Sequence, residues 1–251
     1  GVDPYRLSPN KRSVFRAQNI GFVFQFFYIR RTNKRLAFER NRSDQILLNI
    51  LPKETAEELK ENGFVKTREL EQVTVLFTDF KAFSTIAERI SAEDLIRSVD
   101  YYFKNFDEIT ERYNLEKIKT IGDAYMAVAG VPSAHYQPEH AMVRLARDLY
   151  AHALEVGERH GVELEMRIGM ASGPIMAGVV GKSKYSYDVW GAAVNLASRL
   201  EHVGTPGCVV VTGDIKVVLQ ADHEFERAGT VELKGFGKVP VWRMDCAGQT
   251  G

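Results

Sequence analysis

Cysteine is scarce in this sequence. Only Cys208 and Cys246 occur among 251 residues, and their separation matches no metal-ligand spacing. This excludes a disulfide-rich scaffold and a cysteine-based zinc site, and it is typical of free thiols in a reducing compartment. There is also no signal-peptide pattern. We therefore expect the main part of the protein to lie in the cytoplasm.

A long apolar run is missing as well. The longest candidate, IGFVFQFFYI at residues 20–29, is well short of the roughly 20 residues that cross a bilayer. It is followed by RRTNKR, the basic flank expected on the cytoplasmic side of a membrane segment. Two interpretations stay open. The segment is a packed or interfacial amphipathic stretch, or it is the stub of a region tethered to the inner face of a membrane.

The chain has no net charge, but its charged residues are unevenly distributed. The chain has 33 basic and 33 acidic residues, yet residues 1–42 hold ten Lys or Arg against Asp3 and Glu39. The first part therefore carries +8 and the remainder −8, which indicates two regions in different surroundings. An acidic globular part that lacks the aromatic pattern of RNA-binding sheets argues against a nucleic-acid partner.

The N-terminal third favours helices. Residues 33–51 have apolar positions near heptad spacing, and Pro52 should end that helix. A short helix then runs to Gly63. We divide the chain into a basic, apolar segment (1–35), a connector helix (36–63) and a globular domain (71–245). The connector is interpreted as a dimerising element; an amphipathic helix lying on the domain is the alternative.

The globular part alternates between the two periodicities of strands and helices. Its order predicts a ferredoxin-like βαββαβ core with a C-terminal βαβ extension, hence an α+β fold. The expected elements are strands at 73–79, 115–120 and 124–130, helices at 92–113, 139–161 and 191–204, a hairpin at 162–181 turning at Ser172–Gly173, and later strands near 207–215 and 232–244.

Two acids interrupt apolar strands in this pattern. Asp79 ends VTVLFTDF, and Asp123 follows Gly122 in KIKTIGDAYMAVAG. Each alone could serve a turn. In a ferredoxin-like core, however, the first and third strands are neighbours, so the two acids can converge. Paired carboxylates suit Mg²⁺ or Mn²⁺, and two such ions would support in-line displacement at phosphorus.

Four motifs carry a resemblance to a known family. VTVLFTDFKAFS, KIKTIGDAYMAVAGVP, MRIGMASGPIMAGVVG and YDVWGAAVNLASRLE occur in this order. Together they resemble the catalytic domain of class III nucleotidyl cyclases, the adenylyl and guanylyl cyclases, over residues 71–244. The segment FERNRSDQILLNILPKETAEEL also looks like the connector helix that precedes such domains in receptors. An upstream sensor or membrane domain in the full-length protein is the corresponding expectation.

The resemblance implies roles for the two acids and the segment after Asp79. Asp79, Asp123 and the Phe80 carbonyl match the family's metal contacts, with two Mg²⁺ or Mn²⁺ ions per site. The segment that contains Phe83 and Ser84 should open a helix, whose free backbone N–H groups would bind a triphosphate. The implied reaction converts ATP to 3′,5′-cyclic AMP and pyrophosphate.

The resemblance also implies the base-reading pair. Lys119 and Asp188 fall where adenylyl cyclases place the residues that read adenine, whereas guanylyl cyclases usually have Glu and a small residue such as Cys. Lysine only donates hydrogen bonds and ionised aspartate only accepts them, which matches adenine N6 and N1 and mismatches guanine.

The remaining implied residues act on the ribose and phosphates. Asn195 and Arg199, one helical turn apart, match the residues that orient the ribose and stabilise charge at the reacting phosphate, and Lys234 matches a terminal-phosphate contact. In the family the metal-binding aspartates come from one chain, and the adenine-reading pair, the Asn and the Arg come from the other. This chain carries both sets, so the resemblance implies a homodimer with two shared sites. A guanylyl cyclase and a non-catalytic dimerising module are the alternatives.

Overall fold

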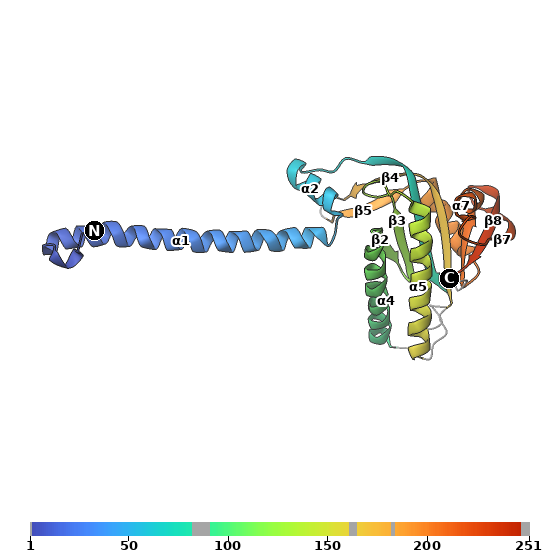
Figure 1. The fold of residues 1–251 in the computed structure, drawn as a ribbon, viewed down its shortest axis with the longest axis horizontal. Helices are drawn as coiled ribbons and strands as arrows, with labels where there is room; N and C mark the ends of the chain where they lie inside the picture. Colours follow the sequence, from blue (N-terminus) through green and yellow to red (C-terminus); the bar gives the residue numbers. More distant parts are fainter. Residues whose placement is uncertain (1, 82–90, 161–164, 182–183, 247–251) are drawn as a thin grey trace. The chain divides into compact units, whose positions relative to one another are not determined.

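The structure is a computed structural model that describes residues 2–81, 91–160, 165–181 and 184–246, with the side chains of 20–27, 92, 95 and 160 left out. The chain divides into two compact units, residues 1–51 and 52–251. Each unit is described by itself. Figure 1 shows both, coloured along the sequence.

The first unit is almost entirely one helix. α1 (Pro9–Leu48) follows a short 3₁₀ turn, η1 (Pro4–Arg6). Arg12 ties this turn to the helix by donating to the carbonyls of Pro4 at 3.0 Å and Tyr5 at 2.7 Å. α1 is continuous across residue 35, where the sequence predicted a boundary between the N-terminal segment and the connector helix, and it ends before Pro52.

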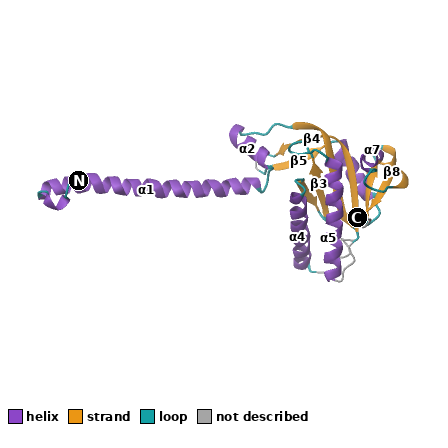
Figure 2. Ribbon diagram, in the orientation of Figure 1, coloured by secondary structure: helices purple, strands orange, loops and turns teal. Residues whose placement is uncertain are grey.

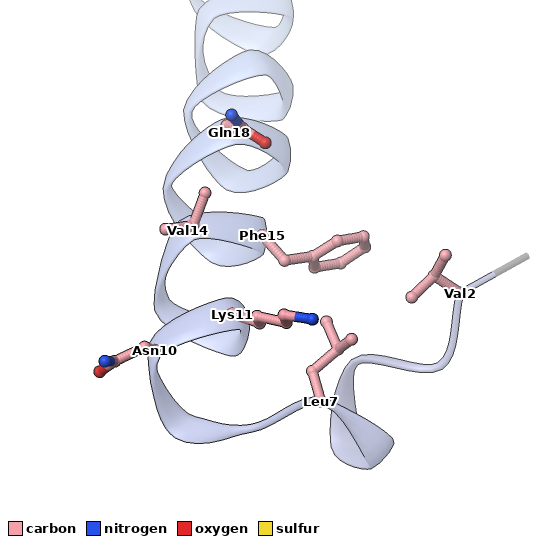
Figure 3. A pocket seen from close by; sticks show the side chains of 7 residues that line it. All are labelled: Val2, Leu7, Asn10, Lys11, Val14, Phe15 and Gln18. Carbon is pink, nitrogen blue, oxygen red and sulfur yellow. The ribbon is translucent and has the colours of Figure 1, made fainter.

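A small apolar pocket of about 400 Å³ lies where η1 meets α1. Val2, Leu7 and Phe15 point toward one another there (Figure 3). Its lining contains no carboxylate, so it does not have the chemistry expected for a cation. Among the residues that the structure describes, no helix carries an apolar stretch long enough to cross a membrane.

The second unit is built on one eight-stranded sheet. After α2 (Lys53–Asn62), its strands run in the order β2-β3-β1-β4-β6-β8-β7, and β5 pairs with β4 outside this path. The strands are β1 (Arg68–Phe80), β2 (Glu116–Ile121), β3 (Ala124–Ala129), β4 (Met166–Val180), β5 (Ser186–Trp190), β6 (Cys208–Thr212), β7 (Glu226–Leu233) and β8 (Gly237–Asp245).

The predicted βαββαβ core is confirmed. Helices α4 (Ala92–Arg112) and α5 (Pro138–His160) supply its two crossovers, and β1 lies between β3 and β4, antiparallel to both. α4 and α5 lie side by side against the strands (Figures 1 and 2). The main apolar core fills the space between these helices and the sheet, and includes Leu76, Phe106, Tyr125, Leu145 and Met166.

A further helix covers the other face of the sheet. α6 (Ala192–His202) packs on β4 and β1, followed along the chain by β6 and α7 (Gly213–Leu219). The approach is close because Gly169 of β4 has no side chain. A Cβ there would stand 2.1 Å from the Glu201 nitrogen and 2.4 Å from the Ala197 carbonyl oxygen. Gly169 thus determines how near α6 lies to the sheet.

The expected hairpin turn at Ser172–Gly173 is wrong. β4 continues through both residues as one strand, and each pairs with β1, Ser172 with Thr74 and Gly173 with Val73. The Thr74 and Ser172 hydroxyls also bond each other at 2.8 Å. The long partner strand satisfies the backbone on both sides of the glycine, so the Ser-Gly pair does not turn. The irregularity falls on β1 instead, between Leu70 and Val73.

Candidate functional site

Asp79 and Asp123 come together at one end of the sheet. Asp79 is the penultimate residue of β1, and Asp123 lies in the turn between β2 and β3, where Gly122 has a φ of +65°. Burial, then a hydrogen bond with Asp79 and the charge of Asp79, raise the pKa of Asp123 to about 6. Two carboxyl groups this close need a proton or a cation between them.

Arg167 supplies positive charge beside this acid pair. It is the cross-strand partner of Asp79 between β1 and β4, and its Nη2 lies 2.5 Å from Asp79 Oδ2. Nη2 also lies 3.1 Å from Oε1 of Glu201, a buried residue of α6. We call Asp79, Asp123, Arg167 and Glu201 the cation half of the site.

The chemistry of the cation half fits a divalent ion. Its donors are hard carboxylate oxygens, the ligands that Mg²⁺ and Mn²⁺ prefer. Among the described residues, no group of three or more His, Cys, Asp or Glu side chains is placed to hold a metal ion alone. Magnesium sites of this kind are usually completed by substrate phosphates and water.

The side chain of Phe80 lies in the core, next to the candidate site. Its ring is buried against Tyr102 and Phe106, with centroids 5.5 Å and 6.3 Å away. Its side chain therefore packs in the core, and the predicted metal contact would come from its backbone carbonyl. The predicted phosphate contacts Phe83 and Ser84 lie outside the described residues.

Lys119 and Asp188 meet across two strands that are not neighbours in the sheet order. Lys119 Nζ of β2 lies 2.6 Å from Asp188 Oδ2 of β5. The backbone nitrogen of Val189 donates to Asp188 Oδ1 at 2.9 Å, which fixes the carboxylate. We call Lys119 and Asp188 the purine half. It joins a donor-only group and an acceptor-only group in one half-buried place.

The other predicted residues stand apart from both halves. Asn195 and Arg199 occupy the exposed face of α6, and neither side chain has a hydrogen bond or ion pair with any residue the structure describes. Lys234 is exposed in the turn between β7 and β8. Within the described ranges, no contact joins Lys234 to the acid pair.

Sequence reasoning missed Arg167 and Glu201. One signal could have found them: Arg167 interrupts the apolar run MRIGMA, and a charge in a buried strand needs a partner of opposite sign. The register that makes Asp79 this partner depends on the β1–β4 pairing. Glu201 reaches Arg167 only because α6 packs tightly at Gly169.

The class of domain that holds this carboxylate pair and this donor–acceptor pair is identified by comparison with known proteins. The profile described as "Adenylate and Guanylate cyclase catalytic domain" matches residues 65–245. The chain therefore belongs to the adenylate and guanylate cyclase catalytic-domain family.

Both substrate classes occur among its relatives. The chain is similar to an adenylate cyclase of Mycobacterium tuberculosis, at 36% identity over 207 residues, covering 82% of this chain and 47% of the relative. It is also similar to human guanylyl cyclase C, at 34% identity over 211 residues, covering 81% of this chain and 20% of the relative. The chain thus spans about half or less of the curated relatives it matches.

A solved structure matches the fold. It is the catalytic core of a rhodopsin-guanylyl cyclase with converted specificity, in complex with ATPαS. The match has a TM-score of 0.68 and 30% identity, and it covers 72% of this chain and 98% of that structure.

Proposed function

We propose that the chain is an adenylyl cyclase domain that converts ATP to 3′,5′-cyclic AMP and pyrophosphate. The observation that carries this choice is the purine half, Lys119 and Asp188 at 2.6 Å. Adenine offers an acceptor at N1 and a donor at N6, and the pair offers one donor and one acceptor. Guanine has the opposite polarity at these positions and would leave both groups unpaired.

The reaction that we propose is an in-line displacement. The ribose 3′-oxygen forms a bond to the α-phosphorus, the bond from the α-phosphorus to the β-bridging oxygen breaks, and pyrophosphate leaves. The 3′-hydroxyl proton goes to an acceptor that we do not assign. Divalent ions, when bound at Asp79, Asp123 and the Phe80 carbonyl, would supply positive charge at the phosphates.

The residues of α6 supply the remaining functions. Asn195 orients the ribose, and Arg199 neutralises charge that develops on the α-phosphoryl group, a preorganised electrostatic role. Both side chains are exposed and unpaired among the described residues, so they are free to enter a second chain's site. We therefore propose a homodimer in which each site combines one chain's cation half with its partner's purine half, Asn195 and Arg199.

The N-terminal unit is proposed as a connector to an upstream sensor. Its basic and apolar composition remains compatible with attachment at the inner face of a membrane, with the catalytic domain in the cytoplasm. Removal of residues 1–50 should change the cyclase rate or the dimer affinity. If both stay unchanged, the connector role is wrong.

Product identity tests the proposed activity. Purified chain is incubated with ATP or GTP, each with Mg²⁺ and with Mn²⁺, and cyclic nucleotides are quantified by chromatography. We expect cyclic AMP as the main product. Preferential formation of cyclic GMP would reverse the base assignment, and no turnover with either nucleotide would favour a non-catalytic module.

A further inference from the structure

Glu201 is a buried acid that the proposed reaction does not yet use. Its side chain is 6% exposed and comes from the last turn of α6, two residues beyond Arg199. Asn195 and Arg199 are exposed, whereas Glu201 faces the sheet. One short helix therefore presents two functional faces.

The end of α6 surrounds the Arg167 guanidinium. Nη2 lies 3.1 Å from Glu201 Oε1, and Nη1 donates to the His202 carbonyl at 3.5 Å. The carbonyl end of a helix carries partial negative charge, which also favours a cation there. Arg167 is thus held between α6 on one side and Asp79 on the other.

This contact is not a saturated structural ion pair. Glu201 Oε1 and Arg167 Nε are both buried, and neither has a hydrogen-bond partner among the described residues. Asp79 and Glu201 both contact one guanidinium, Asp123 is hydrogen-bonded to Asp79, and burial raises the pKa of Glu201 despite the charge of Arg167. The cluster is therefore short of positive charge until a cation binds.

The second acid on Arg167 changes what Asp79 can do. With no other anion nearby, the guanidinium would pair with Asp79 and compete with a divalent ion for its oxygens. With Glu201 present, Arg167 keeps a charged partner when Asp79 turns to the ion. Partners that orient metal ligands in this indirect way commonly affect metal affinity by about 10- to 100-fold.

We infer that Glu201 is a positioning residue for the cation half: it holds Arg167 on α6 and so leaves Asp79 available to bind a divalent cation. The inference rests on the proposed function, because it concerns the same cation site.

Direct Mn²⁺ binding tests this role without depending on turnover. Free Mn²⁺ is followed by electron paramagnetic resonance during titration of the full chain in the presence of a non-hydrolysable ATP analogue, and the Mn²⁺ bound by the analogue alone is subtracted. Glu201→Gln keeps the shape and removes the charge, and we expect about tenfold weaker Mn²⁺ binding. The control is Glu226→Gln, which removes an exposed ion pair with Arg243 on β7 and β8 and should change nothing. Unchanged affinity in Glu201→Gln would overturn the inference.

A double-mutant cycle separates positioning from simple charge attraction. Arg167→Met removes the competing cation and should tighten Mn²⁺ binding. In that background Glu201→Gln should have less than about a twofold effect, because Glu201 acts through Arg167. If it still weakens binding about tenfold, Glu201 acts through space and positioning is refuted. The double variant removes the charges of both Glu201 and Arg167, so neither is left buried without its partner. The test therefore stays usable if Glu201→Gln alone unfolds.

Two further variants complete the design. Glu201→Asp keeps the charge on a shorter side chain and should bind Mn²⁺ with an intermediate affinity; an affinity no better than that of Glu201→Gln would contradict a role for the charge. Asp79→Ala should abolish the measured binding. If the wild-type chain and the Asp79→Ala variant bind Mn²⁺ equally, Asp79 is not part of a cation site. That result refutes both the proposed cation site and the inference. If Asp79→Ala abolishes Mn²⁺ binding but Glu201→Gln leaves the affinity unchanged, the inference is refuted and the proposed cation site stands.

Discussion

The cation half and the purine half differ in how each satisfies its charges. Asp79, Asp123 and Glu201 outnumber Arg167, and two buried atoms there have no hydrogen-bond partner among the described residues. In the purine half, Lys119 and Asp188 balance each other, and a backbone N–H holds the carboxylate. The charges of the cation half are not balanced within it, whereas those of the purine half are.

This difference indicates what each half requires of a nucleotide. The cation half should gain stability when positive charge arrives, so we expect metal and phosphates to bind it together. The purine half must exchange an internal ion pair for hydrogen bonds to a base, which favours only a base that satisfies both groups. Affinity is therefore expected from the first half and selectivity from the second.

Removal of the cation half should have the largest effect. Asp79→Ala deletes one acid of the pair, and we expect cyclic AMP formation to fall by at least about 10³-fold, the scale of lost electrostatic stabilisation in a preorganised site. The matched control, Asp100→Ala, removes an exposed acid that pairs with Lys104 on α4 and should leave the rate unchanged. An Asp79→Ala chain with near-normal turnover would show that the acid pair is not catalytic.

Reversal of the purine half should change selectivity while the cation half stays intact. Lys119→Glu combined with Asp188→Cys replaces a donor by an acceptor, so guanine should fit and adenine should not. We expect the ratio of ATP to GTP turnover to shift toward GTP by about 10²-fold or more. A double variant that still prefers ATP would place base recognition elsewhere.

Displacement of α6 should disturb the cation half through packing. In Gly169→Ala the added methyl group meets the backbone of Ala197 and Glu201, and we expect a loss of about 2 kcal/mol in the free energy of unfolding. Gly178→Ala is the control, because the three atoms nearest to its Cβ all belong to Thr67 and lie at 3.3 Å or more. Urea denaturation compares the two. Equal stabilities would mean that the close approach of α6 is not required.

The smallest expected effect concerns a carboxyl group near the purine half. Burial, then the charge of Glu111, raises the pKa of Glu116 on β2 to about 7. The folded protein therefore holds the Glu116 proton more tightly than the unfolded chain does. The contribution of the protonated Glu116 to the free energy of unfolding is complete below about pH 4.5 and is lost as the pH rises to 7. Glu116→Gln should gain thermal stability relative to wild type between pH 5 and pH 8. A constant difference would show that Glu116 titrates normally.

Much of this organisation follows from local pattern. The period-2 and period-3.6 segments predicted the βαββαβ core, and the adjacency of the first and third strands predicted that Asp79 and Asp123 converge. The turn at Ser172–Gly173 could not be judged locally, because pairing with the distant strand β1 decides whether this Ser-Gly pair turns or stays extended. Arg167 and Glu201 depend on strand register and on the helix approach at Gly169, which no single segment encodes. The roles of all the predicted site residues, including Lys234, Phe83 and Ser84, stay predictions.

The central claim is that one chain's cation half works with its partner's Arg199. Asp79→Ala and Arg199→Ala chains are purified separately, shown to fold and dimerise, then mixed at equal concentration and assayed for cyclic AMP. We expect each variant alone to be inactive and the mixture to recover about a quarter of wild-type activity, because half of the dimers are mixed and each has one intact site. A mixture as inactive as its components, with mixed dimers present, would contradict the account.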